Sequence, residues 1–202
     1  VKDVKESMEA YDIVRASRLL MDYVGELSTW YLRLSRDRLR DAEHNSQSLQ
    51  VFRASIYRWS LLMAPFAPFF TEIIYHNLPG TKNESIHLEL LPDYQENLDH
   101  LELEKKMAEV RKAVERTHAL RKEAGLRVRQ PLSQVQVTSP VEPPYENLLQ
   151  VMASEVNVKK VEWLQGDELK VELNTTLTPE LQSEGQAREL IRSIQDLRKK
   201  EG

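Results

Sequence analysis

Few side chains in this sequence are arranged for catalysis. The five histidines lack the i, i+4 spacing of a helical metal-binding pair: His44, His76, His87, His100 and His118. None of the six glycines belongs to a Gly-rich phosphate-binding loop, and the many carboxylates alternate with lysines and arginines as on solvated helix faces. We therefore expect no self-contained active site, and no cofactor or metal held by these residues.

Arginines beside aromatic residues suggest a different chemistry, the binding of nucleic acid. Trp30 and Tyr31 precede four arginines within about three helical turns: Arg33, Arg36, Arg38 and Arg40. A guanidinium matches the geometry of a phosphate, and an exposed ring can stack on an unpaired base. The alternative is that the two rings belong to the core and that the arginines pair with carboxylates of the same segment: Asp37, Asp41 and Glu43.

Two more groups of basic residues lie in the second half of the chain. Residues 105–130 contain 9 basic and 3 acidic side chains, although the whole chain has a net charge of −4. The end of this block places three cations at a helix end and in the loop after it: Lys122, Arg127 and Arg129. We expect an extended loop in which both arginines point to one side and Val128 packs beneath. The alternative is that these charges only complement the helix dipole. Further arginines recur along the last expected helix: Arg188, Arg192 and Arg198.

The composition excludes several classes of protein. With 41% hydrophobic and 30% charged residues, the 202-residue chain is too apolar for a disordered tail, and its apolar runs are too short for a membrane span. The absence of cysteine rules out a disulfide framework and a thiolate zinc site in this segment. Because residue 1 is a valine inside an expected helix and no signal peptide is recognisable, we expect a piece of a longer, cytoplasmic protein.

Helical periodicity dominates the first half. Apolar residues at steps of three and four predict one long helix from Met8 to Leu34, with this stripe: Ile13, Ala16, Leu20, Tyr23, Leu27, Tyr31 and Leu34. A polar break at residues 45–48 precedes a second helix, 49–64. Pro65 and Pro68 end it and restart a short helix over 69–78. Long helices with short connections predict an antiparallel bundle over residues 1–95.

The second half mixes helical and strand patterns. A helix over 103–123 ends at Ala124-Gly125, and a strand-like run follows at 132–137. A helix over 142–154 precedes two strands, 156–164 and 169–173, which Gly166-Asp167 should join as a hairpin. Thr178 and Pro179 begin a last helix that runs to about Lys200. We expect no internal repeat. The predicted fold class is mainly α with a small α+β part, in which residues 96–202 form a small mixed α/β domain.

Four stretches of the sequence resemble the isoleucyl-tRNA synthetases, a family of class I aminoacyl-tRNA synthetases. The segment Leu27-Ser28-Thr29-Trp30-Tyr31-Leu32-Arg33, followed by Arg36-Asp37-Arg38, is similar to part of the family's anticodon-binding bundle. Residues 62–69 and 85–88 resemble the closing helix of this bundle and the segment by which the chain leaves it. Residues 121–132, which read RKEAGLRVRQPL, are similar to a stretch of the isoleucyl enzymes in particular. So are two later segments, EVNVK at 155–159 and EGQARELIRSIQ at 184–195.

The resemblance implies a tRNA-binding segment that positions the anticodon end of isoleucine tRNA. The family's His-x-Gly-His and Lys-Met-Ser-Lys-Ser signatures are absent, so the segment itself would not be catalytic, and ATP and Mg²⁺ would act in another part of the enzyme. The implied partners are tRNA and the rest of the synthetase chain, in a monomer without a membrane. The tRNA-binding residues would come from the sets above: Trp30, Arg33, Arg36, Arg38, Lys122, Arg127, Arg129, Arg188, Arg192 and Arg198. The alternative function is a structural or protein-docking helical module that binds no nucleic acid.

Overall fold

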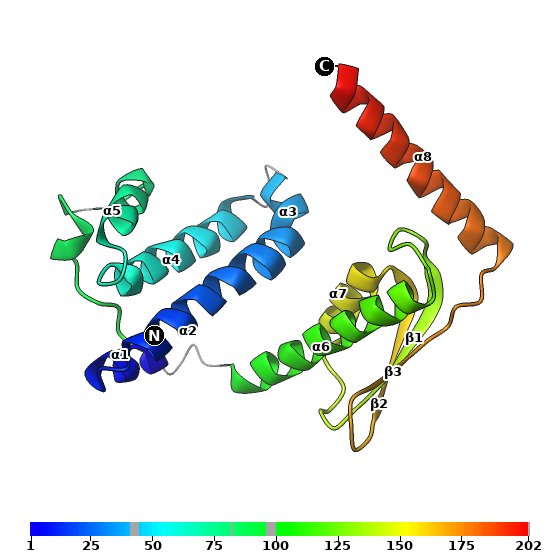
Figure 1. Cartoon of the computed structure of the whole chain (residues 1–202), viewed down its shortest axis with the longest axis horizontal. Helices are drawn as coiled ribbons and strands as arrows, with labels where there is room; N and C mark the ends of the chain where they lie inside the picture. Colours follow the sequence, from blue (N-terminus) through cyan, green and yellow to red (C-terminus); the bar gives the residue numbers. More distant parts are fainter. Residues whose placement is uncertain (41–44, 82, 96–99, 202) are drawn as a thin grey trace. The chain divides into compact units, whose positions relative to one another are not determined.

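The computed structural model describes residues 1–40, 45–81, 83–95 and 100–201. The chain divides into two compact units, the helical unit Val1–Leu98 and the mixed unit Asp99–Gly202. Helices form the first unit, whereas the second combines helices with a three-stranded sheet (Figure 1). The predicted fold class, mainly α with a small α+β part, is therefore confirmed. No helix of the described residues has the length and apolar character needed to cross a membrane.

In the helical unit, α2 and α4 lie side by side and run antiparallel (Figure 1). The described elements of this unit are α1 Lys2–Glu9, α2 Ile13–Glu26, the π-helical turn η1 Leu27–Tyr31, α3 Leu32–Arg40, α4 Asn45–Met63, α5 Pro68–Asn77 and the 3-10 turn η2 Ile86–Leu88. α5 begins at Pro68, one residue before the predicted start, because a helix's first turn needs no amide hydrogen from that position.

The single long helix predicted from Met8 to Leu34 is wrong. Tyr11 has a left-handed backbone with φ of 58°, which separates α1 from α2. Asp12 caps α2 by accepting a hydrogen bond from the amide of Arg15 at 3.0 Å. Periodicity alone missed this junction because the apolar spacing continues through it. The polar break at residues 45–48 is also wrong, since α4 already begins at Asn45.

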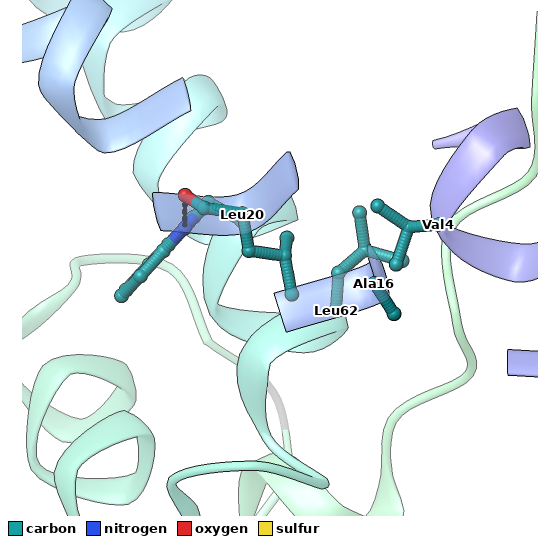
Figure 2. Packing of buried hydrophobic residues seen from close by; sticks show 5 residues of the cluster. Val4, Ala16, Leu20 and Leu62 are labelled. Atoms are coloured by element: carbon teal, nitrogen blue, oxygen red, sulfur yellow. Dashed lines mark hydrogen bonds between the residues drawn. The ribbon is translucent and has the colours of Figure 1, made fainter. Parts of the chain in front are cut away.

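The core of the helical unit joins α1, α2 and α4. Val4, Ala16, Leu20, Trp59 and Leu62 are buried together, and Figure 2 shows these side chains. The indole of Trp59 donates to the backbone carbonyl of Leu20 at 3.0 Å, which fixes α4 against the middle of α2. The predicted stripe is buried at Ala16, Leu20 and Leu27, but its members Ile13 and Tyr23 are exposed because no described element covers them.

The mixed unit has β1 in the centre of its sheet. Its elements are α6 Leu101–Glu123, β1 Leu132–Ser139, α7 Glu146–Val156, β2 Val158–Gln165, β3 Lys170–Leu173 and α8 Pro179–Glu201. The strand order is β2-β1-β3, with β2 parallel and β3 antiparallel to β1. Leu132, Val135 and Val137 of β1 are fully buried, as expected for a central strand. Helix α7 starts later than predicted, beyond Pro143 and Pro144.

The predicted hairpin between the two last strands is wrong. β1 lies between β2 and β3, so the connection after β2 passes the end of β1 instead of forming a tight turn. At this crossing, Gly166 donates its amide hydrogen to Ser139 at 2.9 Å. A Cβ atom at Gly166 would lie 2.3 Å from the Cγ2 atom of Thr138. Glycine is therefore needed here for close approach to β1, and not for a hairpin turn.

Candidate nucleic-acid interface

The first arginine group follows a change in helical repeat. The amide of Leu32 donates to the carbonyl of Leu27, which closes the π-helical turn η1. The hydroxyls of Ser28 and Thr29 donate to the carbonyl of Gly25 at 3.1 and 2.7 Å, just before this wider turn. A π-helical turn adds a residue to the repeat and rotates everything after it. The arginines of α3 therefore point in directions that a regular continuation of α2 would not give.

The two aromatic residues of this turn have different surroundings. Tyr31 donates its hydroxyl hydrogen to the carbonyl of Ser48 at 3.0 Å and stacks on Phe52 of α4, with ring centroids 6.3 Å apart. It therefore holds α3 and α4 together, in agreement with the core alternative. Trp30 is half-buried instead, and the guanidinium of Arg33 lies 5.1 Å from the centre of its ring.

Arg33, Arg36 and Arg38 of α3 are exposed. Two contacts hold the head group of Arg33. Its Nε atom donates to the carbonyl of Thr29 at 3.0 Å, and the guanidinium lies over the ring of Trp30. Arg38 donates to the hydroxyl of Ser35 at 3.1 Å. Arg36 forms no ion pair with any residue that the structure describes. The ion-pair alternative stays a prediction, because the side chains it needs lie outside the described part: Asp37, Arg40, Asp41 and Glu43.

In the mixed unit, the basic loop begins where Gly125 ends α6. Gly125 has a φ of 65°, and the amide of Leu126 donates back to the carbonyl of Arg121 at 2.9 Å. This is the helix stop that the sequence predicted. Lys122, Arg127 and Arg129 are exposed at this end of α6 and in the loop after it.

Arg121 holds this loop from the inside, and sequence reasoning missed it. Its side chain is only 1% exposed, and its guanidinium donates to three carbonyls: those of Arg127 at 3.2 Å, Gln130 at 2.9 Å and Asn157 at 2.9 Å. Burial lowers the pKa of Arg121, but an arginine stays charged at neutral pH. The loop is thus folded around a buried cation, while the other cations point to solvent.

The extended loop with Val128 packed beneath two arginines is wrong. The amide of Gln130 donates to the carbonyl of Arg127 at 3.0 Å, so residues 127–130 form a turn. Val128 is 54% exposed and covers nothing. Arg121 explains the difference, because it pulls the carbonyls of Arg127 and Gln130 to one point and bends the segment between them.

Asn157 connects this loop to α8. It has a left-handed backbone with φ of 52° at the end of α7, and its side-chain amide donates to the carbonyl of Val128 at 3.0 Å. Its side-chain oxygen accepts a hydrogen bond from Arg188 at 2.7 Å. Arg188 also pairs with Glu184 at 2.8 Å, and Glu184 pairs with Lys159 of β2 at 2.6 Å. The Lys159 pair lowers the pKa of Glu184.

The start of α8 is fixed against the same loop. The side-chain amide of Gln130 donates to the carbonyl of Leu181 at 2.7 Å, and a Cβ atom at Gly185 would lie 2.3 Å from the Gln130 Oε1 atom. Glycine at position 185 therefore lets α8 approach the loop. Arg127 and Glu189 of α8 are 3.8 Å apart, which is a loose pair.

The structure thus brings together only part of the predicted interface. Arg188 binds Asn157, which also holds the loop at Val128, and Arg127 of the loop lies 3.8 Å from Glu189 of α8. Arg192 instead pairs with Asp196 further along α8 at 3.2 Å. Arg198 contacts none of the described side chains. Within the described ranges, no group of three or more His, Asp or Glu side chains is placed to hold a metal ion.

Comparison with known proteins identifies relatives of the chain. Residues 1–137 match the family model of the anticodon-binding domain of tRNA ligases. The chain is 34% identical to the isoleucine–tRNA ligase of Thermoplasma acidophilum over 97% of its own length and 19% of that relative. It is 37% identical to the Treponema denticola ligase over 80% of the chain and 15% of the relative, and 35% identical to the Clostridium tetani ligase over 93% and 18%. The chain therefore spans about a fifth of the length of these relatives, and it belongs to the family of anticodon-binding domains of tRNA ligases.

Proposed function

We propose that this chain is the part of an isoleucine–tRNA ligase that binds isoleucine tRNA and positions its anticodon end. The joining of isoleucine to tRNA would use ATP and Mg²⁺ in another part of the ligase. The parent protein would act as a cytoplasmic monomer without a membrane. Its family and the identity of its relatives support this proposal, as does the row of exposed arginines on α3.

The observation that carries the proposal is the placement of Arg33, Arg36 and Arg38. All three lie within the part of the chain that matches the anticodon-binding family, directly after the π-helical turn. Arg33 is held by Trp30 and by the carbonyl of Thr29, so little side-chain entropy is lost when it binds a phosphate. Arg33 and Arg36 lie one helical turn apart on α3, so their guanidiniums can contact neighbouring phosphates of an RNA backbone.

The loop after α6 offers a second contact. Arg127 and Arg129 project from a turn whose backbone is fixed by Arg121 and Asn157, so their positions do not depend on a partner. The pair between Arg127 and Glu189 is too loose to hold Arg127 away from a phosphate. Both surfaces act through phosphates, so they would supply affinity and orientation, while base contacts would have to supply discrimination.

The test is the salt dependence of binding to an isoleucine tRNA transcript. Each phosphate contact releases counterions, so the logarithm of the binding constant should fall steeply with the logarithm of salt concentration. The expected slope is about −3 to −5, from roughly four to six phosphate contacts. The protein-docking alternative predicts no tRNA binding at 50–200 mM salt, and that result would overturn the proposal.

A further inference from the structure

The last helix carries an apolar face that nothing described covers. From Gln186 to Lys200 every side chain of α8 except that of Glu189 is exposed. Four of these exposed residues lie along one side of the helix, and each is between 48% and 62% exposed: Leu190, Ile191, Ile194 and Leu197. An exposed apolar stripe of this size indicates a surface that another molecule or chain segment covers.

α6 and α8 share a short sequence motif of four positions. Leu120-Arg121-Lys122 is followed three residues later by Gly125, and Leu197-Arg198-Lys199 is followed three residues later by Gly202. In α6 the motif stands at the end of the helix, which ends at Glu123.

The match extends to the faces of the two helices. When the motifs are aligned, the buried positions Val110, Ala113, Val114 and Thr117 of α6 correspond to Ala187, Leu190, Ile191 and Ile194 of α8. In α6 this face packs against α7 and the sheet. In α8 the same face is apolar but bare.

The arginines of the motif show the same contrast. Arg121 extends the buried face of α6 and gathers the carbonyls of the loop that leads into β1. Arg198 occupies the aligned position of α8, and it is exposed without a hydrogen bond or ion pair to any described residue. Arg198 thus occupies the position that anchors a loop in α6.

We propose that α8 is the first helix of a second unit of the α6–loop–β1 type, and that its bare face is covered by a strand-bearing segment of the parent synthetase. In α6 the strand begins at Leu132, seven residues after the glycine of the motif. The covering segment would follow the second motif in the same way, with Arg198 binding the carbonyls of its loop. The relatives are about five times longer than this chain, which leaves room for such a segment.

The chemistry of the face favours a protein occupant over RNA or a second copy. Leucine and isoleucine side chains have no group that can bind a phosphate. Two arginines of α8 outside the motif already form ion pairs within the helix, Arg188 with Glu184 and Arg192 with Asp196. Two copies of α8 in contact would leave both Arg198 guanidiniums without the loop carbonyls that the aligned Arg121 binds.

Hydrogen–deuterium exchange in the absence of tRNA tests this inference independently of tRNA binding. The 202-residue chain is compared with the full-length synthetase that carries it, and exchange is followed in peptides covering residues 186–198. We expect exchange to be at least about a hundredfold slower in the full-length protein, because a covered helix opens only with the unit it packs on. In the full-length protein, Ile191→Asp should remove at least tenfold of this protection, whereas Ser193→Asp, which adds the same charge outside the stripe, should not. Arg198→Met should also reduce protection in the full-length protein.

Three results would overturn the inference. Equal exchange in the two proteins would mean that α8 stays bare. Protection in the 202-residue chain that rises with protein concentration would identify a second copy as the occupant. Protection that develops only after tRNA is added would assign the face, against its chemistry, to RNA.

Discussion

Replacing Arg121 by methionine should destabilise the mixed unit by about 2–4 kcal/mol. Methionine has a similar length and no charge, so the change removes three hydrogen bonds to carbonyls without opening a large cavity. Two of those carbonyls keep a backbone partner, because Arg127 accepts from Gln130 and Asn157 accepts from Leu132. Each hydrogen bond from a charged donor contributes roughly 1.5–3 kcal/mol to stability. The methionine variant no longer has to bury a charged guanidinium, and the desolvation penalty it avoids offsets several kcal/mol of that sum.

The assay is urea unfolding followed through Trp163, whose indole donates to the carbonyl of Val141 at 3.2 Å in the mixed unit. The other two tryptophans, Trp30 and Trp59, belong to the helical unit and are replaced by phenylalanine in the background protein. Lys122→Met is the matched control, because it removes an exposed cation from the next position of the same helix and should change stability by less than about 0.5 kcal/mol.

Two outcomes would refute this reasoning. If Arg121→Met unfolds at the same urea concentration as the control, the buried guanidinium does not hold the loop. If the variant is more stable than the parent, the cost of burying the charge exceeds what the three hydrogen bonds return.

Three other predictions concern binding, backbone packing and pH. The double variant Arg33→Ala, Arg36→Ala should bind tRNA more weakly by roughly 1–3 kcal/mol, and its salt slope should be shallower by about 2. Filter binding between about 50 and 200 mM salt measures both. An unchanged slope in the folded double variant would show that these arginines contact other protein groups and not phosphates. Gly166→Ala should cost about 1–3 kcal/mol in urea unfolding because its Cβ atom would lie 2.3 Å from a threonine methyl carbon. Gly25→Ala, near the end of α2, should instead stabilise its unit by roughly 0.5–1 kcal/mol because nothing lies within 4 Å of a Cβ atom there. Equal effects of the two substitutions would contradict this account. The pKa of Glu184 is lowered in the folded chain from its ordinary value of 4.5, so the stability it contributes is present above that pH and is lost as the pH falls through the lower folded value. A carboxyl titration by NMR should show this lowered pKa, and removal of the lysine partner on β2 should raise it toward 4.5; no difference between the two proteins would refute the cause given.

Local signals in the sequence predicted the ends of several elements correctly. Gly125 ends α6 in a left-handed conformation, Pro68 begins α5, and Thr178 caps α8 through a bond from the amide of Leu181 at 3.4 Å. Each depends on the conformational preference or the hydrogen bonding of one residue with its neighbours, which the sequence contains in full.

The pairing of the strands depended on distant residues. The alternating pattern identified β2 and β3 as strands, but such a pattern does not say which strand lies beside which. The central strand β1 pairs on both edges and thereby separates the two strands that a hairpin would have joined.

The exposed part of the candidate site was easier to predict than its support. Arginines with solvated neighbours stand out by charge, and Arg33, Arg36, Arg127 and Arg129 are all exposed. Arg121 was missed because a basic residue in a basic helix suggests a solvated side chain. The signal was its position, since it continues the apolar stripe of α6 four residues after Thr117.

The central claim is that this chain binds isoleucine tRNA through its anticodon end. Competition binding at about 100 mM salt measures this most directly, with unlabelled isoleucine tRNA set against the same tRNA carrying the anticodon stem and loop of another amino acid's tRNA. The account predicts that the chimeric tRNA competes at least about tenfold less well, and that returning the anticodon arm restores competition. Equal competition by the two tRNAs would show that the chain does not distinguish the anticodon end, and would contradict the proposed function.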